Sequence, residues 1–199
     1  MGIKESSDEL NPVVVTAQAP VRAKPIRSVK DYLALAIATC GVGYMPIAPG
    51  TFGSLVGLGI YFILQSVVFD NMLPGATHFS RWPMFLAIQL TAITLITLVG
   101  IWAATRTEKL AGRKDPGKVV VDEVAGQLIA LLPISSAVGA SWIPISAFFL
   151  FRLFDIIKPY PARRLESLES GLGIMADDVV AGAYAAVVVS LIVLVRTFN

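Results

Sequence analysis

The chain alternates between long uncharged apolar runs and short clusters of charged residues. The apolar runs cover residues 32–69, 84–105, 124–151 and 179–195. A membrane-spanning helix needs about 20 apolar residues, with roughly 17–25 as the working range. Runs 84–105 and 179–195 therefore each predict one span, and the whole pattern predicts an all-α integral membrane bundle.

The other two runs contain helix-breaking residues. Run 32–69 is too long for one helix, and its glycines and prolines predict a helix at about 33–40, a tight loop, and a helix at about 52–69. These residues are Gly41, Gly43, Pro46, Pro49 and Gly50. Run 124–151 is divided by Pro133 and Pro144 into pieces that are short for independent crossings, so a shallow helical hairpin and two tilted spans both fit it. We expect five or six helices in total.

The composition agrees with a membrane setting. With 199 residues, 55% hydrophobic and 15% charged, the chain is too apolar for an ordinary soluble domain. Residues 28–199 are expected to form one membrane domain, and the polar, proline-containing residues 1–27 a disordered tail. A net charge of +2 is too small to indicate a nucleic-acid partner. Cys40 is the only cysteine, which excludes an internal disulfide. No pattern predicts an oligomeric state.

Basic residues are concentrated in segments that the spans place on one side of the membrane. Segments 22–30, 106–118 and 158–164 fall on that side, and only Arg81 and Arg196 fall on the other. The positive-inside rule makes the basic side cytoplasmic. All the charged clusters therefore gather at one boundary, which we expect to be the cytoplasmic face of a bacterial inner membrane.

Carboxylates next to membrane segments are costly, and this chain has six of them in or beside the polar clusters. They are Asp115, Asp122, Glu123, Asp155, Asp177 and Asp178. Two adjacent pairs are predicted to begin apolar helices, where an acid can serve simply as a cap or dipole partner. Capping two helix starts does not require six acids. Oxygen ligands without histidine or thiolate suit Mg²⁺, and in each pair one residue is expected to face the site.

Two further clusters could bind phosphate. Arg152, Asp155 and Lys158 recur at helical spacing, which fits either a structural salt-bridge ladder or two cations that hold phosphate oxygens around a metal-binding aspartate. Gly50, Thr51 and Ser54 lie at the expected start of a helix, where exposed N–H groups favour an anion. Glycines there could equally serve close helix packing.

The remaining residue types narrow the chemistry. His78 is the only histidine and falls in the predicted outer loop, so a phosphohistidine intermediate and Ser-His catalysis are not expected. Carboxylates and a divalent ion remain, with either activated water or an aspartate attacking phosphorus.

Four motifs occur together and in order. They are Ala-Pro-Gly-Thr-Phe-Gly-Ser at 48–54, an extended run ending in Asp-Glu at 119–123, Phe-Arg-Leu-Phe-Asp-Ile-Ile-Lys-Pro at 151–159, and Gly-Leu-Gly-Ile-Met-Ala-Asp-Asp with its continuation at 171–182. This ordered set, which covers about residues 30–195, resembles the phosphatidylglycerophosphatase A family. Ser170 replaces a glycine that often precedes the last motif.

The resemblance implies Mg²⁺-dependent removal of the terminal phosphate from the phospholipid phosphatidylglycerophosphate. It also implies that the six acids are metal ligands. Among them Asp122, Glu123 and Asp178 are expected to be catalytic. Phosphate contacts are expected from Gly50, Thr51, Ser54, Arg152 and Lys158.

Three other classes of membrane protein fit the sequence less well. A small ion-coupled transporter would place its acids deep inside spans, whereas these acids are predicted at span ends. A phosphatidyl-transferring synthase needs an Asp-Gly-x-x-Ala-Arg segment, which the chain lacks. A structural membrane protein with capped helices does not require the ordered motifs.

Overall fold

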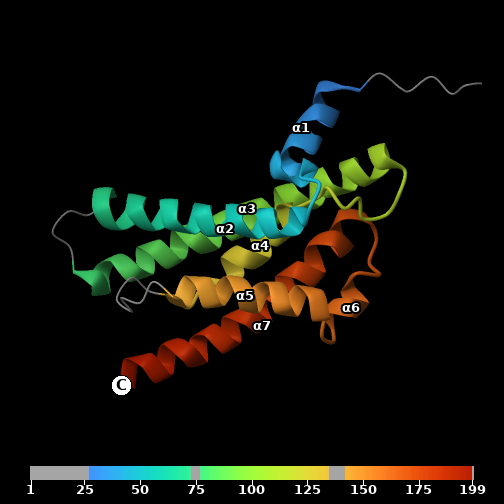
Figure 1. The fold of residues 1–199 in the computed structure, drawn as a ribbon. Coiled ribbons are helices and arrows are strands. Elements are labelled where there is room, and N and C mark those ends of the chain that lie inside the picture. The colour runs from blue at the N-terminus through green and yellow to red at the C-terminus, as the bar shows by residue number, and fades with distance from the viewer. Residues whose placement is uncertain (1–26, 73–76, 135–141, 199) are drawn as a thin grey trace, which may run out of the picture.

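A computed structural model describes residues 27–72, 77–134 and 142–198 (Figure 1). Every regular element in these residues is a helix, which confirms the predicted all-α class. The α-helices are α1 Val29–Thr39, α2 Pro49–Ser66, α3 His78–Ala111, α4 Val121–Ala130, α5 Trp142–Ile157, α6 Ala162–Leu165 and α7 Ser170–Phe198. The described residues thus contain seven α-helices rather than five or six, and one of them, α6, is a single turn of 4 residues. Residues 1–26, which hold nearly all of the predicted tail, lie outside the described part.

Three helices in the described part of the chain are long and apolar enough to cross a membrane. These candidate spans cover Pro49–Phe69, Arg81–Ala111 and Ser170–Phe198, and the first includes α2 with part of a π-helical extension, Val67–Met72. Only 22–33% of the residues in their apolar windows are buried inside the protein. Most of their hydrophobic surface therefore faces outward, where lipid would cover it.

The described part of run 124–151, residues 124–134 and 142–151, does not supply a further candidate span. It contributes most of α4, with 10 residues, and the first part of α5, which has 16 residues in all. At 1.5 Å per residue α4 is about 15 Å long, half of the roughly 30 Å hydrocarbon thickness. Eight of its residues are buried, and it packs against α2, α3, α5 and α7. Two tilted spans are therefore wrong for this run, because α4 is a central core helix; the link at 135–141 lies outside the described residues.

Local sequence signals explain where the first helices begin and end. Ser28 and Asp31 form a capping box at the start of α1, and Cys40, which follows the last residue of α1, has a left-handed conformation. Ala48 is also left-handed, and Pro49 follows it as the first residue of α2. A break between these helices is thus confirmed, but it covers residues 40–48, because α2 begins at Pro49 and not at about 52. The short 3-10 helix Val42–Tyr44 lies within it.

The loop between α3 and α4 is held against this break. The Val120 N–H donates to the carbonyl of Ala38 at 2.8 Å, and an added Cβ on Gly43 would overlap the Lys118 carbonyl oxygen. This packing fixes the start of α4 beside the start of α2. Arg106 in α3 also pairs with Asp31 in α1 at 2.6 Å.

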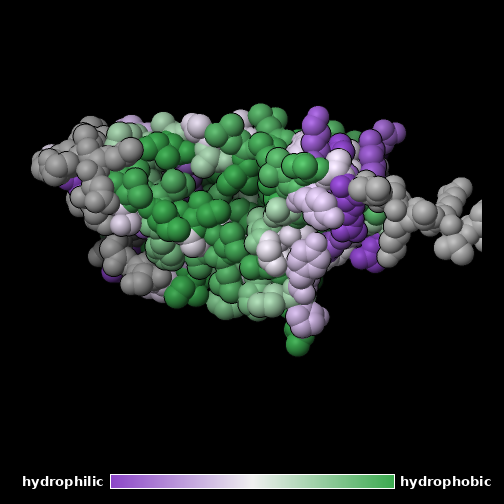
Figure 2. Space-filling model, turned by 90° about the horizontal axis from the view of Figure 1, so that it is seen from above, coloured by the Kyte–Doolittle hydropathy of each residue, from purple (hydrophilic) through white to green (hydrophobic). Residues whose placement is uncertain are grey.

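Hydrophobic and hydrophilic residues separate along the length of the bundle. On the face shown in Figure 2, hydrophobic residues cover the middle of the molecule and hydrophilic residues gather at one end. That end includes the loop between α3 and α4 and the turn after α5 (Figure 1). The fold therefore has a hydrophobic middle, as expected of a membrane protein, and one polar end.

Candidate active site

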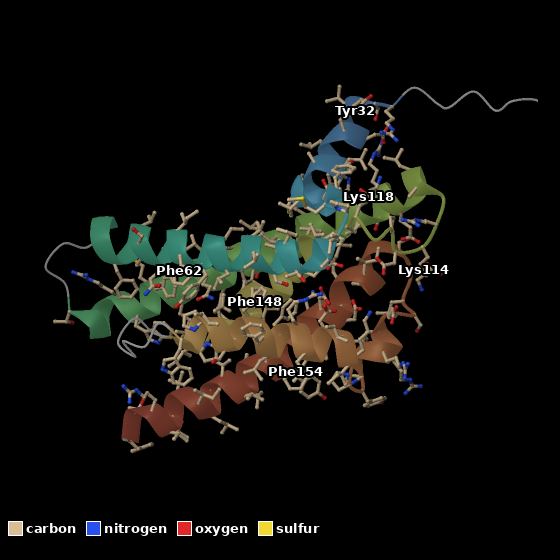
Figure 3. All side chains as sticks on the ribbon, viewed as in Figure 1. Tyr32, Phe62, Lys114, Lys118, Phe148 and Phe154 are labelled. Atoms are coloured by element: carbon tan, nitrogen blue, oxygen red, sulfur yellow. The ribbon has the colours of Figure 1, made fainter. Side chains whose placement is uncertain are left out.

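A cavity of about 660 Å³ lies at the polar end. Its walls come from the starts of α2 and α4, from the loop after α3, from the end of α5, and from α6 and α7. In Figure 3 side-chain oxygens and nitrogens crowd between these elements, and Lys114 lies on the loop beyond α3. The cavity is lined by seven carboxyl and four basic side chains, an excess of three negative charges: Asp115, Asp122, Glu123, Asp155, Glu166, Asp177, Asp178, Lys114, Arg152, Lys158 and Arg163.

Glycines bring the helices close enough for these side chains to meet. A Cβ added to Gly50 would lie 2.2 Å from Oε1 of Glu123 and 3.1 Å from Nη1 of Arg152. On the other side of α4, a Cβ on Gly182 of α7 would lie 2.4 Å from the carbonyl oxygen of Gly126. The starts of α2 and α4 and the middle of α7 can therefore approach only because side chains are missing at these points.

Three carboxylates converge on one point in the cavity. One oxygen from each of Asp122, Glu123 and Asp178 lies within 4.8 Å of the others, so the three could hold a metal ion. Oδ1 of Asp122 and Oε2 of Glu123 are buried without a hydrogen-bond partner. Burial, together with repulsion from Glu123 and Asp178, raises the pKa of Asp122 well above its ordinary value. A cation bound between these groups would stabilise them in their charged form.

The second acid pair does not lie where the sequence predicted. Asp177 and Asp178 are more than one turn inside α7, which begins at Ser170, and not at its start. The helix begins earlier because Gly171 packs against the Ile101 carbonyl and Thr105 of α3 and does not break the chain. Capping cannot explain two buried acids at this position.

The basic residues of α5 and its following turn pair with different acids. Nη1 of Arg152 lies 2.6 Å from Oδ2 of Asp155. Nζ of Lys158 lies 2.6 Å from Oδ2 of Asp177 and 3.4 Å from Glu166. A continuous ladder along α5 is therefore wrong, because the helix ends at Ile157 and Lys158 turns toward α7. Burial opposes the charge of Lys158, but its two acidic partners raise its pKa above the ordinary value.

The other predicted site residues divide into two groups. Gly50 and Asp115 line the cavity, although Asp115 is not one of the three converging acids. Thr51 and Ser54 do not line it, and the buried Ser54 hydroxyl donates to the Gly50 carbonyl at 3.0 Å. Ser54 therefore has a local hydrogen bond within α2. His78 is the first residue of the 34-residue α3, at the end remote from the cavity.

Four polar lining residues were not predicted as part of the site. They are Lys114, Arg163, Glu166 and Ser167. Lys114 directly precedes Asp115, and the other three follow the proline-containing turn after α5. Their proximity to predicted site residues was the only available signal, because no spacing pattern links a loop after α3 to a turn before α7.

Comparisons with known proteins agree with the motifs. Residues 35–193 match the family described as phosphatidylglycerophosphatase A. The phosphatidylglycerophosphatase A of Haemophilus influenzae is 40% identical over 150 residues, 75% of this chain and 81% of the relative. That of Escherichia coli is 30% identical over 147 residues, 73% of this chain and 74% of the relative.

A relative named for a different lipid is also similar. A candidate phosphatidylinositol-3-phosphatase of Bacteroides thetaiotaomicron is 37% identical over 157 residues, 76% of this chain and 87% of the relative. No solved structure shows a significant match. Because the family model covers most of the chain and two relatives carry the same name, the chain belongs to the phosphatidylglycerophosphatase A family.

Proposed function

We propose that this protein is a Mg²⁺-dependent phosphatase that hydrolyses the terminal phosphate of phosphatidylglycerophosphate and releases phosphatidylglycerol. The observation that carries the proposal is the cavity at the polar end of an apolar bundle, in which three converging carboxylates lie with Arg152 and Lys158. Family membership supplies the substrate class. The positive-inside distribution of Lys and Arg supports a cytoplasmic site in a bacterial inner membrane.

The residues present fit a magnesium ion. All the converging ligands are carboxylate oxygens, which Mg²⁺ prefers, and no histidine or cysteine is among the lining residues. The unpartnered oxygens of Asp122 and Glu123 and the excess of negative charge call for a cation. Asp122, Glu123 and Asp178 would hold the ion. Bound there, it would supply neutralisation of phosphate charge and activation of water.

The other residues have roles that follow from their positions. Arg152 presents a planar guanidinium suited to two phosphate oxygens, and Gly50 leaves space beside it. Lys158 contributes a second positive charge and is held in place by Asp177 and Glu166. A carboxylate of the converging group accepts the proton from the water that attacks phosphorus. The P–O bond to the lipid alcohol breaks, the carboxylate returns the proton to the departing lipid oxygen, and phosphatidylglycerol and inorganic phosphate leave.

The position of the cavity matches a lipid substrate. The acyl chains can remain along the outward hydrophobic surfaces of the helices, while the headgroup enters the polar end. The phosphate then reaches the acids without crossing the membrane interior. A soluble phosphate ester would not need this combination of an apolar body and a polar end.

A second lipid is a candidate because of one relative. The Bacteroides relative is named as a phosphatase of phosphatidylinositol-3-phosphate, a lipid that also carries its reactive phosphate on a headgroup polyol. The sites of the two substrates would therefore share the same chemistry. Direct competition between the lipids decides which one this chain prefers.

The test is phosphate release from pure lipids in mixed micelles. Phosphatidylglycerophosphate, phosphatidylinositol-3-phosphate and phosphatidic acid are each supplied with Mg²⁺ or with EDTA. We expect release that is fastest from phosphatidylglycerophosphate and is abolished by EDTA. A preference for the inositol lipid would change the substrate and leave the site intact. No release from any lipid by folded, Mg²⁺-supplied protein would overturn the proposal.

A further inference from the structure

Two basic residues at the cavity rim have no role in the site described above. Both residues line the cavity: Lys114 lies on the loop after α3, and Arg163 lies on α6. Both side chains are exposed, and neither forms an ion pair with any described residue. In contrast, Arg152 and Lys158 are held by carboxylates deeper in the same cavity. The rim therefore offers two positive charges that are free to bind an anion.

Arg163 also lies where the apolar surface meets the cavity. The end of α5 and the turn after it expose three large apolar or aromatic side chains, Ile156 at 73%, Ile157 at 60% and Tyr160 at 70%. Arg163 follows them directly on α6. A lipid whose chains cover this apolar surface would pass Arg163 before its headgroup reached the acids.

The proposed substrate has a chemical feature that matches this arrangement. Phosphatidylglycerophosphate carries two phosphates: a phosphodiester next to the diacylglycerol and a terminal phosphomonoester. The deep acids, Arg152 and Lys158 account for the phosphomonoester alone. A cavity of about 660 Å³ can enclose a headgroup of this size.

We propose that Arg163 and Lys114 form a second phosphate subsite that binds the phosphodiester of the substrate. This proposal rests on the proposed function and specifies how the same site selects its lipid. Lipids with a phosphodiester and a terminal phosphate gain contacts at both subsites. Phosphatidic acid has only one phosphate, and that phosphate cannot fill both.

The same subsite would accommodate both lipids to which the names of the similar proteins refer. Phosphatidylglycerophosphate and phosphatidylinositol-3-phosphate differ in the polyol, but both contain the phosphodiester and the phosphomonoester. A site that recognises both phosphates accepts lipids that differ in the polyol that links the two phosphates. Discrimination against phosphatidic acid is then the property that these rim residues determine.

The test compares substrates in matched variants. Arg163→Ala and Lys114→Ala are expected to lower kcat/KM for phosphatidylglycerophosphate by about tenfold each, because each removes a charged contact to phosphate. The kcat/KM for phosphatidic acid should change less than about threefold, because that lipid does not use the subsite. Neighbouring residues that do not line the cavity provide the controls, Arg164→Ala for Arg163 and Arg113→Ala for Lys114. These controls should leave the ratio of the two substrates unchanged while removing the same charge.

Product inhibition gives a readout that does not depend on the chemical step. Phosphatidylglycerol keeps the phosphodiester and lacks the phosphomonoester, whereas inorganic phosphate has no phosphodiester. Arg163→Ala should weaken inhibition by phosphatidylglycerol about tenfold and leave inhibition by inorganic phosphate unchanged.

The outcomes separate this proposal from the one on which it rests. Equal losses on all substrates in the rim variants, or equal losses in the control variants, would overturn the second subsite while the phosphatase assignment stands. Wild-type protein that releases phosphate from no lipid would overturn both. A selective loss on two-phosphate lipids, with weaker phosphatidylglycerol inhibition, would support the subsite.

Discussion

Replacing Gly50 with alanine tests whether the position of Glu123 controls catalysis. The added Cβ would lie 2.2 Å from Oε1 of Glu123, so the carboxylate must withdraw by at least about 0.8 Å to reach a 3.0 Å contact. It cannot simply move toward Arg152, whose Nη1 lies 3.1 Å from the same Cβ. Misplacement of a catalytic group by about 1 Å can cost about 100-fold in rate. We therefore expect kcat/KM to fall about 100-fold.

The stability of the variant should change in a different way. Alanine is a better helix former than glycine by at most about 1 kcal/mol, and the clash involves the far end of a side chain. Thermal unfolding in detergent should therefore remain close to that of the wild type. Gly59→Ala is the matched control on the same helix, because its Cβ would meet nothing within 4 Å. That variant should keep full activity.

The assay is phosphate release from phosphatidylglycerophosphate at saturating Mg²⁺, with unfolding followed on the same preparations. A Gly50→Ala variant that keeps more than about a third of wild-type kcat/KM would refute the reasoning, because Glu123 would then tolerate displacement. A large fall in thermal stability would also refute it, since the loss would then reflect the fold and not the site.

Three further predictions concern the acids, the guanidinium and the helix packing. Asp122→Asn and Asp178→Asn should each lower kcat by about 10²–10⁴-fold while membrane insertion, measured by fractionation, is unchanged; near-normal turnover in both would discard the site. Arg152→Lys should lower kcat/KM about tenfold, because the two-pronged contact to phosphate is lost, and unchanged kcat and KM would contradict that role. Gly182→Ala should destabilise the protein by about 1–3 kcal/mol, because its Cβ would lie 2.4 Å from the Gly126 carbonyl oxygen; an unchanged melting temperature in detergent would show that α4 and α7 can separate at no cost.

Much of the fold could be predicted from the sequence because membrane spans leave a strong signal. Long apolar runs gave the three candidate spans, and the glycine and proline residues near Gly50 gave the break before α2. The role of α4 could not be predicted. A helix buried by other helices and a helix covered by lipid are both apolar, so composition alone does not separate them. Only the length of α4 and its contacts with α2 and α7 identify it as the core.

The site was predictable in its residue types but not in its pairings. The motifs predicted that the two acid pairs belong to the site, and three of these four acids converge in the structure. The partner of Lys158 was missed, because Asp177 is distant in sequence and lies on another helix. Glycines occupy two different kinds of position. Gly41 lies in a break between helices, whereas Gly171 lies inside α7 at a close helix contact. Sequence cannot distinguish a glycine that ends a helix from one that lets two helices touch.

The central claim is that Asp122, Glu123 and Asp178 hold the cation on which phosphate release depends. The most direct measurement is a titration with Mn²⁺, followed by electron paramagnetic resonance, of detergent-purified wild type and of the variant carrying Asp122→Asn, Glu123→Gln and Asp178→Asn. The account predicts saturable binding to the wild type, competition by Mg²⁺, and loss of both binding and phosphate release in the variant. Equal Mn²⁺ binding by the two proteins, or phosphate release that persists in the variant, would contradict it.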